Sequence, residues 1–315
     1  LMAASIIIMF LDELIQKGWG LGSGISLFIM AGVAQQILWS MFSPLPAGDG
    51  GMIGIIPYLI ESLTGSGDLG NVLFRSNQLP SIFGLFLTAG ILLILVFTQG
   101  MKIEIPIVST KYRGFQAVYP IKLMYVSNIP VILASALTAN AVFVFQMIWS
   151  NFNPRNNNFF VNFIAQFDPT SPSTPIGGII YYVTPPRGLD VAALDPMRAV
   201  GYVLFMIGIV VVFGRLWVEL GGLSPKSAAQ NLLDADVQIP GFRRSNKPVE
   251  ALLNKYIPSV TIIGSMILGL LAGVSDVLGV FGSGIGILLM VDILINYYTQ
   301  LVREQVEVVM PRLGA

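Results

Sequence analysis

The chain has 315 residues, of which 54% are hydrophobic and only 11% are charged. Because soluble domains carry charge on about 25% of their residues, this composition excludes a water-soluble globular protein. The 17 basic and 17 acidic residues cancel, and the chain has neither His nor Cys. A disulfide framework, a thiolate or imidazole metal site and histidine-dependent catalysis are therefore excluded as well.

The first ten residues are apolar but too few to cross a bilayer, which takes about 20 residues. They also lack the basic start and the small-residue cleavage site of a signal peptide. We expect residues 1–10 to be the end of a helix. Because residue 1 is Leu, we interpret the chain as the C-terminal part of a longer membrane protein.

Long charge-free runs predict the membrane-spanning helices. Four runs of 20 or more residues carry no charge, and two further apolar stretches carry one charge each. Each is long enough to cross the hydrocarbon core, which is about 30 Å thick. We therefore predict six spanning helices, near residues 24–43, 80–100, 124–150, 198–218, 257–275 and 284–302.

The basic residues are divided unequally between the two sets of loops. Segments 11–23, 101–123, 215–256 and 303–315 together hold 13 of the 17 Lys and Arg residues. Because cytoplasmic loops of membrane proteins carry an excess of basic residues, we assign these segments to the cytoplasm. The sequence thus predicts a multi-pass protein of the cell membrane with its basic loops in the cytoplasm.

The two longest loops on the opposite side contain recurring apolar residues, so we expect them to be ordered. In loop 44–79, the sequence MIGIIPYLIESL predicts a short helix at the membrane interface. In loop 150–197, the β-branched and aromatic sequence IIYYVTPP, residues 179–186, predicts a short strand.

Two cytosolic segments carry turn signals beside basic residues. Residues 103–122 are β-branched and aromatic on both sides of Gly114, which predicts a β-hairpin whose tip presents Lys111 and Arg113. The segment 219–256 contains a Ser-Pro pair that predicts a short helix over residues 226–233. After a Pro-Gly turn, the same segment presents Arg243 and Arg244.

The predicted fold class is therefore all-α. It is a polytopic membrane helix bundle of six complete transmembrane helices plus the end of a seventh, with a small cytosolic β-hairpin.

Several unrelated motifs occur along the chain. They are LDELIQKGWGLGSGISLFI (11–29), KYRGFQAVYPIKLMYVSNIPVIL (111–133), SPKSAAQNL (224–232), IPGFRRSNKPVE (239–250), NKYIP (254–258) and GSGIGILL (282–289). Their sequences and their order resemble the SecY family, the central subunit of the protein-translocation channel, and most of all its archaeal branch. The resemblance extends over essentially the whole chain.

The resemblance implies that the chain is the C-terminal part of the ten-helix SecY channel domain. Residues 1–10 would be the end of helix four. Residues 24–150 would form helices five to seven with cytosolic loop 101–123, and residues 198–302 helices eight to ten with cytosolic loop 219–256. Helices one to three and the plug segment of the family have no counterpart in the sequence.

In the family, a ring of aliphatic side chains narrows the pore at mid-membrane. The matching positions are Ile25 and Ile29 on helix five, Ile132 on helix seven and Leu289 on helix ten. Ile25 and Ile29 are four residues apart and therefore share one helix face. A collar of branched aliphatic side chains offers ions and water no polar partner, so it blocks leakage by dewetting.

The resemblance also implies a lateral gate and a docking surface. Asn140 matches a polar position on helix seven, beside the seam through which membrane segments reach lipid. Lys111, Arg113, Arg243 and Arg244 lie on the two basic loops where the family binds the ribosome. An arginine fork suits the phosphate oxygens of RNA.

The implied function is a passive conduit that moves unfolded polypeptides across the membrane and releases membrane segments into lipid. It needs no cofactor, metal or catalytic residue. The implied partners are a SecE-type tilted-helix subunit, a small single-span third subunit, the ribosome, signal sequences, nascent polypeptides and the lipid bilayer.

The residues themselves leave rival interpretations open. Asp292 lies inside a spanning segment, and an intramembrane acid commonly marks an ion path, which favours an ion-coupled secondary transporter. Alternatively, Asp292 faces a basic residue, a partner subunit or water. The glycine runs 20–24 and 282–286 lack the strand and lysine of a nucleotide site, and they predict tight entries into helices instead. An intramembrane hydrolase and a purely structural scaffold are the weaker alternatives.

Overall fold

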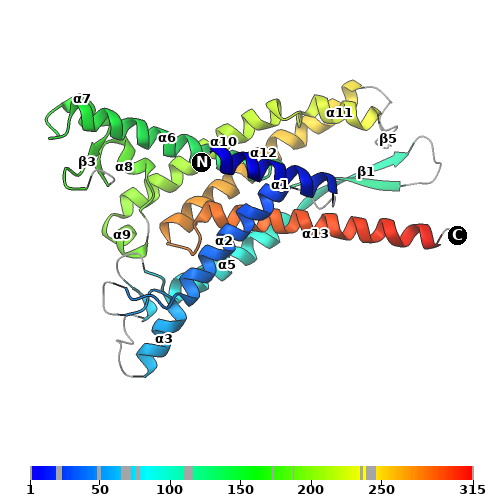
Figure 1. Ribbon diagram of the computed structural model, residues 1–315. Coiled ribbons are helices and arrows are strands. Elements are labelled where there is room, and N and C mark those ends of the chain that lie inside the picture. The colour runs from blue at the N-terminus through cyan, green and yellow to red at the C-terminus, as the bar shows by residue number, and fades with distance from the viewer. Residues whose placement is uncertain are drawn as a thin grey trace. The chain divides into compact units, whose positions relative to one another are not determined.

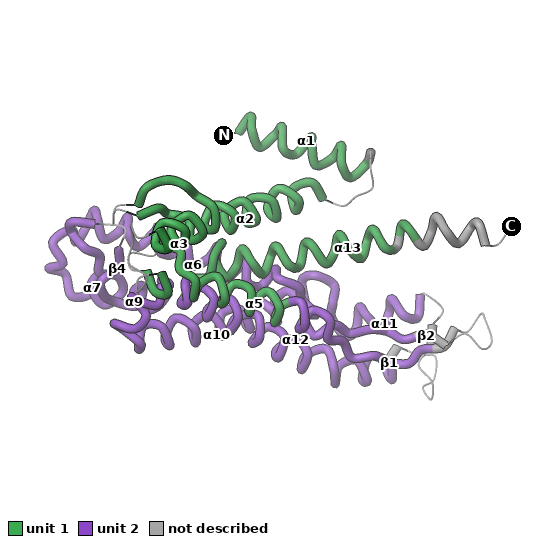
Figure 2. Tube along the Cα trace, turned by 90° about the horizontal axis from the view of Figure 1, so that it is seen from below, with its two compact units in different colours: residues 1–95, 280–315 green, residues 96–279 purple. Residues whose placement is uncertain are grey.

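The computed structural model describes residues 2–18, 23–47, 51–64, 72–75, 79–109, 116–171, 174–186, 188–234, 237–238 and 246–313. The chain divides into two compact units, coloured separately in Figure 2. Unit 1 consists of residues 1–95 and 280–315, and unit 2 of residues 96–279.

Six helices in the described ranges are long and apolar enough to cross a membrane, which confirms the predicted all-α polytopic fold. In the notation of Figure 1 they are α2 (Gly24–Phe42), α5 (Ile82–Gly100), α6 (Ile129–Phe152), α10 (Pro196–Leu220), α12 (Asn246–Val277) and α13 (Gly284–Leu313). A further helix, α1 (Met2–Gly18), continues well past the ten residues expected to be helical.

Unit 1 is organised around α2 and α13. The N-terminus of α13 follows Gly282, which has φ +83° and where an added Cβ would lie 3.0 Å from Ile37 on α2. One turn later, a Cβ at Gly286 would lie 3.3 Å from Val33. The predicted tight helix entry is therefore present: glycines at the start of α13 allow it to pack closely against α2.

Unit 2 is held together by close packing of α10 against α12. A Cβ at Gly269 of α12 would lie 2.8 Å from the backbone of Ile207 on α10, and a Cβ at Gly214 of α10 would collide with Ser265. Gly264 similarly lies directly against the carbonyl oxygen of Leu123. Small residues at such crossings let membrane helices approach until their backbones touch.

The predicted hairpin is present and belongs to a larger sheet. Strands β1 (Lys102–Ser109) and β2 (Gln116–Lys122) pair antiparallel, with Ile105 opposite Tyr119. The short strand β5 (Val237–Gln238) joins the other edge of β1, giving the order β2-β1-β5. In unit 2 this sheet and the helix α11 (Pro225–Asp234) lie at one end of α10 and α12. The helix predicted over residues 226–233 is therefore confirmed.

The opposite end of unit 2 is formed by short elements between α6 and α10 (Figure 1). They are α7 (Phe159–Ile164), β3 (Gln166–Phe167), β4 (Pro175–Gly177), α8 (Ile179–Val183) and α9 (Leu189–Leu194). Their core contains Trp149, Phe167 and Ile180, each no more than 3% exposed.

The strand predicted over residues 179–186 is wrong, because residues 179–183 form helix α8. Tertiary contacts override the β-propensity of this short segment. The Tyr181 carbonyl accepts a hydrogen bond of 3.1 Å from the Arg198 side chain, and the Tyr181 hydroxyl donates to Asp195 over 2.7 Å. In unit 1, the helix expected within residues 52–63 is present as α3 (Ile55–Leu63).

Candidate functional site

Two of the predicted ring residues lie in the first turns of α2. The side chains of Ile25 and Ile29 are each 42% exposed within the described structure. Counted from Ile25 at 100° of rotation per residue, Ile29, Val33 and Ile37 lie about 40°, 80° and 120° round the helix, so the four residues form one stripe. Val33 and Ile37 pack towards α13 at one end of this stripe, whereas Ile25 and Ile29 at the other end remain partly exposed within unit 1.

The start of α2 is fixed by a carboxylate from α1. One oxygen of Asp12 accepts hydrogen bonds from the Ser23 hydroxyl over 2.9 Å and from the Ile25 backbone N–H over 3.0 Å. The N–H of Ile25 lowers the pKa of Asp12 below its usual value, with further help from Ser23 and Gln16. The hydroxyl of Tyr297 donates to the Ser23 carbonyl over 2.5 Å, so α13 contacts the same turn. These contacts position Ile25 at its end of the helix.

The other two ring residues lie on α13 and α6. Leu289 in unit 1 is half-buried and follows Ile287 and Leu288, which are 0% and 1% exposed. Ile132 in unit 2 is 39% exposed, although its neighbour Val131 is fully buried. Each unit thus presents branched or aliphatic side chains on a helix face that its own packing does not cover.

Asn140, the predicted gate residue, lies on the exposed surface of α6. Its side-chain amide donates to the carbonyl of Ala136 over 2.8 Å, within the same helix. This bond partly satisfies the amide without a second helix. Asn140 therefore stays accessible to a group outside unit 2.

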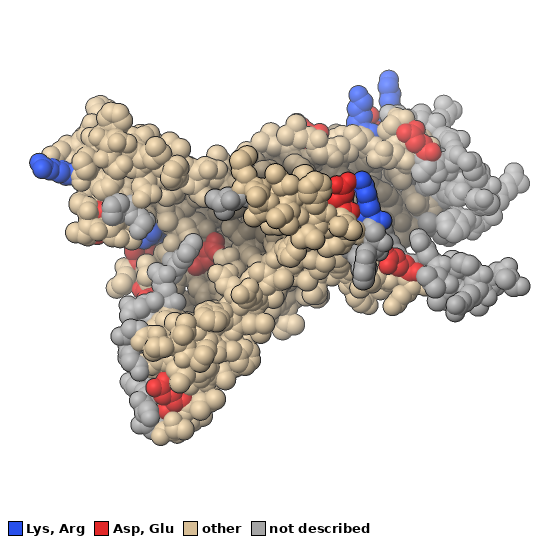
Figure 3. Space-filling model, viewed as in Figure 1, with Lys and Arg blue, Asp and Glu red and all other residues tan. Residues whose placement is uncertain are grey.

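The predicted docking residues Lys111, Arg113, Arg243 and Arg244 lie outside the described residues. The structure does describe how their loops are joined: Val108 and Ser109 of β1 pair with Gln238 and Val237 of β5. Charged side chains are sparse on the face shown in Figure 3, where the helices present broad uncharged surfaces. Such a surface is expected for helices in contact with lipid.

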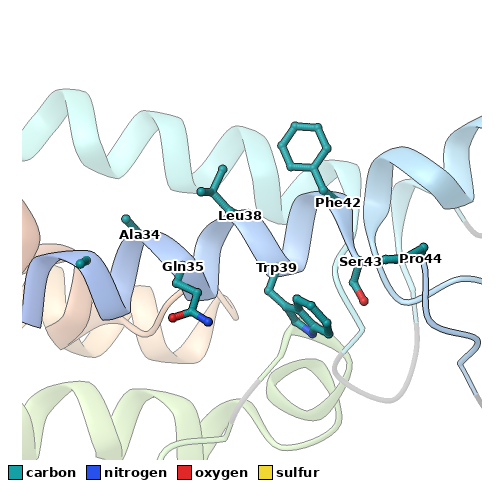
Figure 4. A pocket seen from close by; sticks show the side chains of 8 residues that line it. Ala34, Gln35, Leu38, Trp39, Phe42, Ser43 and Pro44 are labelled. Atoms are coloured by element: carbon teal, nitrogen blue, oxygen red, sulfur yellow. The ribbon is translucent and has the colours of Figure 1, made fainter. Parts of the chain in front are cut away.

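A second face of α2, which the sequence analysis did not predict, is hollowed (Figure 4). The hollow has a volume of about 590 Å³ and is almost entirely apolar. Its lining residues come from α2 and the residues that follow it, and they recur every three to four positions, a spacing visible in the sequence: Ala31, Ala34, Gln35, Leu38, Trp39, Phe42, Ser43 and Pro44.

Asp292 is half-buried on α13 and takes part in an interaction within the molecule. Among the residues that the structure describes, no group of three or more acidic residues could hold a metal ion.

Comparisons with known proteins show which family the sequence resembles. The model of the SecY family matches residues 1–298. A protein translocase subunit SecY of Pyrococcus horikoshii is 41% identical over 318 residues, covering 98% of this chain and 65% of that protein. The chain therefore spans slightly less than two thirds of the curated relative.

Solved structures show the same similarity. One described as "The structure of a protein conducting channel" has a TM-score of 0.74 and 35% identity, covering 96% of this chain and 63% of that chain. Another, described as Sec61 in the canine ribosome-channel complex from the endoplasmic reticulum, has a TM-score of 0.71 and 33% identity over 96% of this chain and 63% of that chain.

Proposed function

This chain belongs to the SecY family, and from that premise we propose that it supplies the pore-forming part of a channel that conducts unfolded polypeptides across a membrane. The observation that carries the proposal is the family match over residues 1–298 together with six helices able to span a membrane. The protein is a multi-pass membrane protein of this family. The cytoplasmic placement of its basic loops belongs to the proposal and is supported by the excess of Lys and Arg in them.

In the proposed pore, Ile25, Ile29, Ile132 and Leu289 form the constriction. The exposure of the three isoleucines supports this role, because a side chain that contacts a passing polypeptide must not be buried in its own unit. Branched aliphatic side chains offer water and hydrated ions no polar partner, so the constriction stays dry and excludes them. An extended polypeptide can pass because it breaks no hydrogen bond of the constriction.

We assign the lateral gate to the surface of α6 that carries Asn140. The side-chain amide of Asn140 already donates to the carbonyl of Ala136, so it is partly satisfied without a partner. A partner across the seam would add one further hydrogen bond. Hydrogen bonds between membrane helices are worth about 0.6 kcal/mol on average, which suits a latch that must open repeatedly.

The basic segments around Lys111, Arg113, Arg243 and Arg244 are proposed to dock the ribosome. Support comes from the similarity to a channel in a ribosome-channel complex. A SecE-type subunit and a small single-span subunit are the further proposed partners. Residues 1–10 are assigned to helix four, 24–150 to helices five to seven and 198–302 to helices eight to ten of the family domain.

The channel proposal is tested by site-specific crosslinking to a stalled polypeptide in the complete channel. Photoreactive side chains at Ile25, Ile29, Ile132 and Leu289 are expected to crosslink to the passenger. Leu38 is the matched control, because it is on the same helix as Ile25, is 55% exposed and lies on roughly the opposite face. If Leu38 captures the passenger and the four ring positions do not, the pore assignment is wrong.

The alternative of an ion-coupled transporter rests on Asp292 alone, a half-buried acid within the span of α13. Uptake driven by a proton or sodium gradient in vesicles containing the complete channel would support it. We expect such gradients to drive no uptake.

A further inference from the structure

Four phenylalanines at one end of unit 2 are exposed. Phe152, the last residue of α6, is 76% exposed, and Phe159, Phe160 and Phe163 on α7 are 77%, 80% and 65% exposed. We call these four residues the α7 patch. In both views of the molecule, α7 lies at the end of α6 (Figures 1 and 2). Large apolar side chains clustered on a surface mark a contact with a membrane or another protein.

The helix α7 is amphipathic with its polar side turned inwards. Positions 159, 160, 163 and 164 share one face of about 140°, and these side chains are exposed. The opposite face carries Val161, which packs against the core of this end, and Asn162. A helix in water would instead present its amide outwards and its phenyl rings inwards.

The inward face is held by a network of asparagine side chains. Asn162 donates to the carbonyl of Asn156 over 2.7 Å and accepts from Asn153 over 2.7 Å. Asn156 in turn accepts a hydrogen bond of 2.6 Å from the indole N–H of Trp149 and donates to the carbonyl of Phe167 over 3.1 Å. These bonds fix α7 to the end of α6, so the outward direction of the phenyl rings is built into the fold.

The patch lies where a spanning helix ends. The helix α6 is long and apolar enough to cross a membrane, and Phe152 is its last residue. Arg155, which is exposed, comes three residues after Phe152. Aromatic and basic side chains together are typical of segments that lie at the boundary between hydrocarbon and headgroups.

We propose that the α7 patch is a lipid anchor that inserts its phenyl rings into the bilayer interface beside α6. The anchor fixes the depth of the end of α6, the helix that carries Asn140. The proposal depends on the membrane location of the protein and not on its channel activity. It goes beyond the pore and the docking loops, which involve other residues.

The test uses the complete channel in phospholipid vesicles and the absence of native cysteine in this chain. Single cysteines at Phe159, Phe160 and Phe163 are spin-labelled, and collisions with oxygen and with a water-soluble nickel chelate are measured. Asn157 is the matched control, because it is exposed, polar and two residues before Phe159. Leu204 on the spanning helix α10, which is 63% exposed, serves as the lipid reference.

We expect labels at the three phenylalanine positions to collide with oxygen several-fold more, relative to the chelate, than the label at Asn157. Their ratio of oxygen to chelate collisions should approach that at Leu204. Free access of the chelate to all three positions would place the patch in water and overturn the proposal.

Protection from both oxygen and chelate would instead show that protein covers the patch, which also overturns the proposal. Dilution with unlabelled channel would then show which protein covers the patch. Loss of spin–spin broadening would indicate a second copy of the channel, and an unchanged spectrum would indicate a partner subunit. Because three positions are tested singly, failure of one variant to fold leaves the other two measurements decisive.

Discussion

The helices α2 and α12 look alike in sequence and differ in structure. Both are apolar enough to span a membrane, with mean hydropathies of 1.6 and 2.0 over a stretch of 18 residues. In that stretch of α12, 56% of the residues are buried within the described structure, whereas none is buried in that of α2. Hydropathy therefore identifies both as membrane helices. It does not show which helix is buried in the core of its unit and which leaves its faces free to contact lipid or other protein.

The largest expected effect comes from truncating a buried leucine of α12. Leu268 is 0% exposed, so Leu268→Ala should lower the free energy of unfolding by about 2–5 kcal/mol. The control Leu38→Ala on α2 removes a side chain that is 55% exposed and should cost less than about 0.5 kcal/mol. Unfolding in mixed micelles of increasing SDS content measures both, and equal losses would remove the distinction between the helices.

The next effect concerns the close approach of α12 to its neighbours. Gly264→Ala places a methyl group against the Leu123 carbonyl oxygen, which cannot rotate away. We expect a loss of about 1–3 kcal/mol, as for other overpacked sites. Gly208 on α10 has no atom within 4 Å of an added Cβ, so Gly208→Ala should be nearly neutral. Protease resistance after stepwise heating measures both variants, and similar curves would argue against backbone contact at Gly264.

A smaller effect is expected from a polar contact between α10 and α12. The hydroxyl of the buried Tyr202 donates to Asp276 over 2.9 Å. Tyr202→Phe removes this donor and should cost about 0.6 kcal/mol, the average for hydrogen bonds between membrane helices. A double-mutant cycle with Asp276→Asn isolates the coupling between the two side chains, and Tyr298→Phe at a 69% exposed position is the control. A coupling of zero would contradict the geometry.

The smallest effect concerns the start of α2 and depends on pH. Because the N–H of Ile25 lowers the pKa of Asp12, the ionised carboxylate stabilises the folded state at any pH above about 3.9, the value expected for the unfolded chain. This contribution disappears as the pH falls through the lowered pKa. Asp12→Asn should remove that part of the acid dependence, as measured by unfolding at graded pH. If both proteins lost the same free energy of unfolding as the pH was lowered, the contact between Asp12 and the N–H of Ile25 would be contradicted.

The membrane spans could be predicted from the sequence because hydrocarbon tolerates few charges. Their ends were predicted less well. Helix α12 begins at Asn246, eleven residues before the predicted start, because Val249, Leu253 and Ile257 recur every four residues and are all buried. This period was present in the sequence, but a search for charge-free runs passes over it.

Contacts between distant segments could not be predicted from local patterns. Residues 179–183 have strand-like side chains, yet they form α8 because Arg198 and Asp195 bind Tyr181. The third strand of the sheet, β5, is two residues long and pairs with a segment more than a hundred positions away. Such short elements have no periodicity of their own.

The residues of the candidate site could be predicted from the sequence, but the surfaces on which they lie could not. The motifs indicated Ile25 and Ile29, and their i, i+4 spacing placed them on one face. Only the structure shows that Ile25 and Ile29 stay partly exposed although α13 packs against Val33 and Ile37, and that Asn140 bonds within its own helix. The hollow beside Trp39 was missed because an apolar helix face does not reveal whether anything covers it.

The pairing of β5 with β1 has a mechanical consequence. Two loops that are far apart in sequence are fastened by main-chain hydrogen bonds into one sheet, and β2 leads from that sheet into α6. A force applied to either loop is therefore shared by both and transmitted through the sheet to the start of α6. Disrupting the pairing at residues 237–238 would uncouple the two loops.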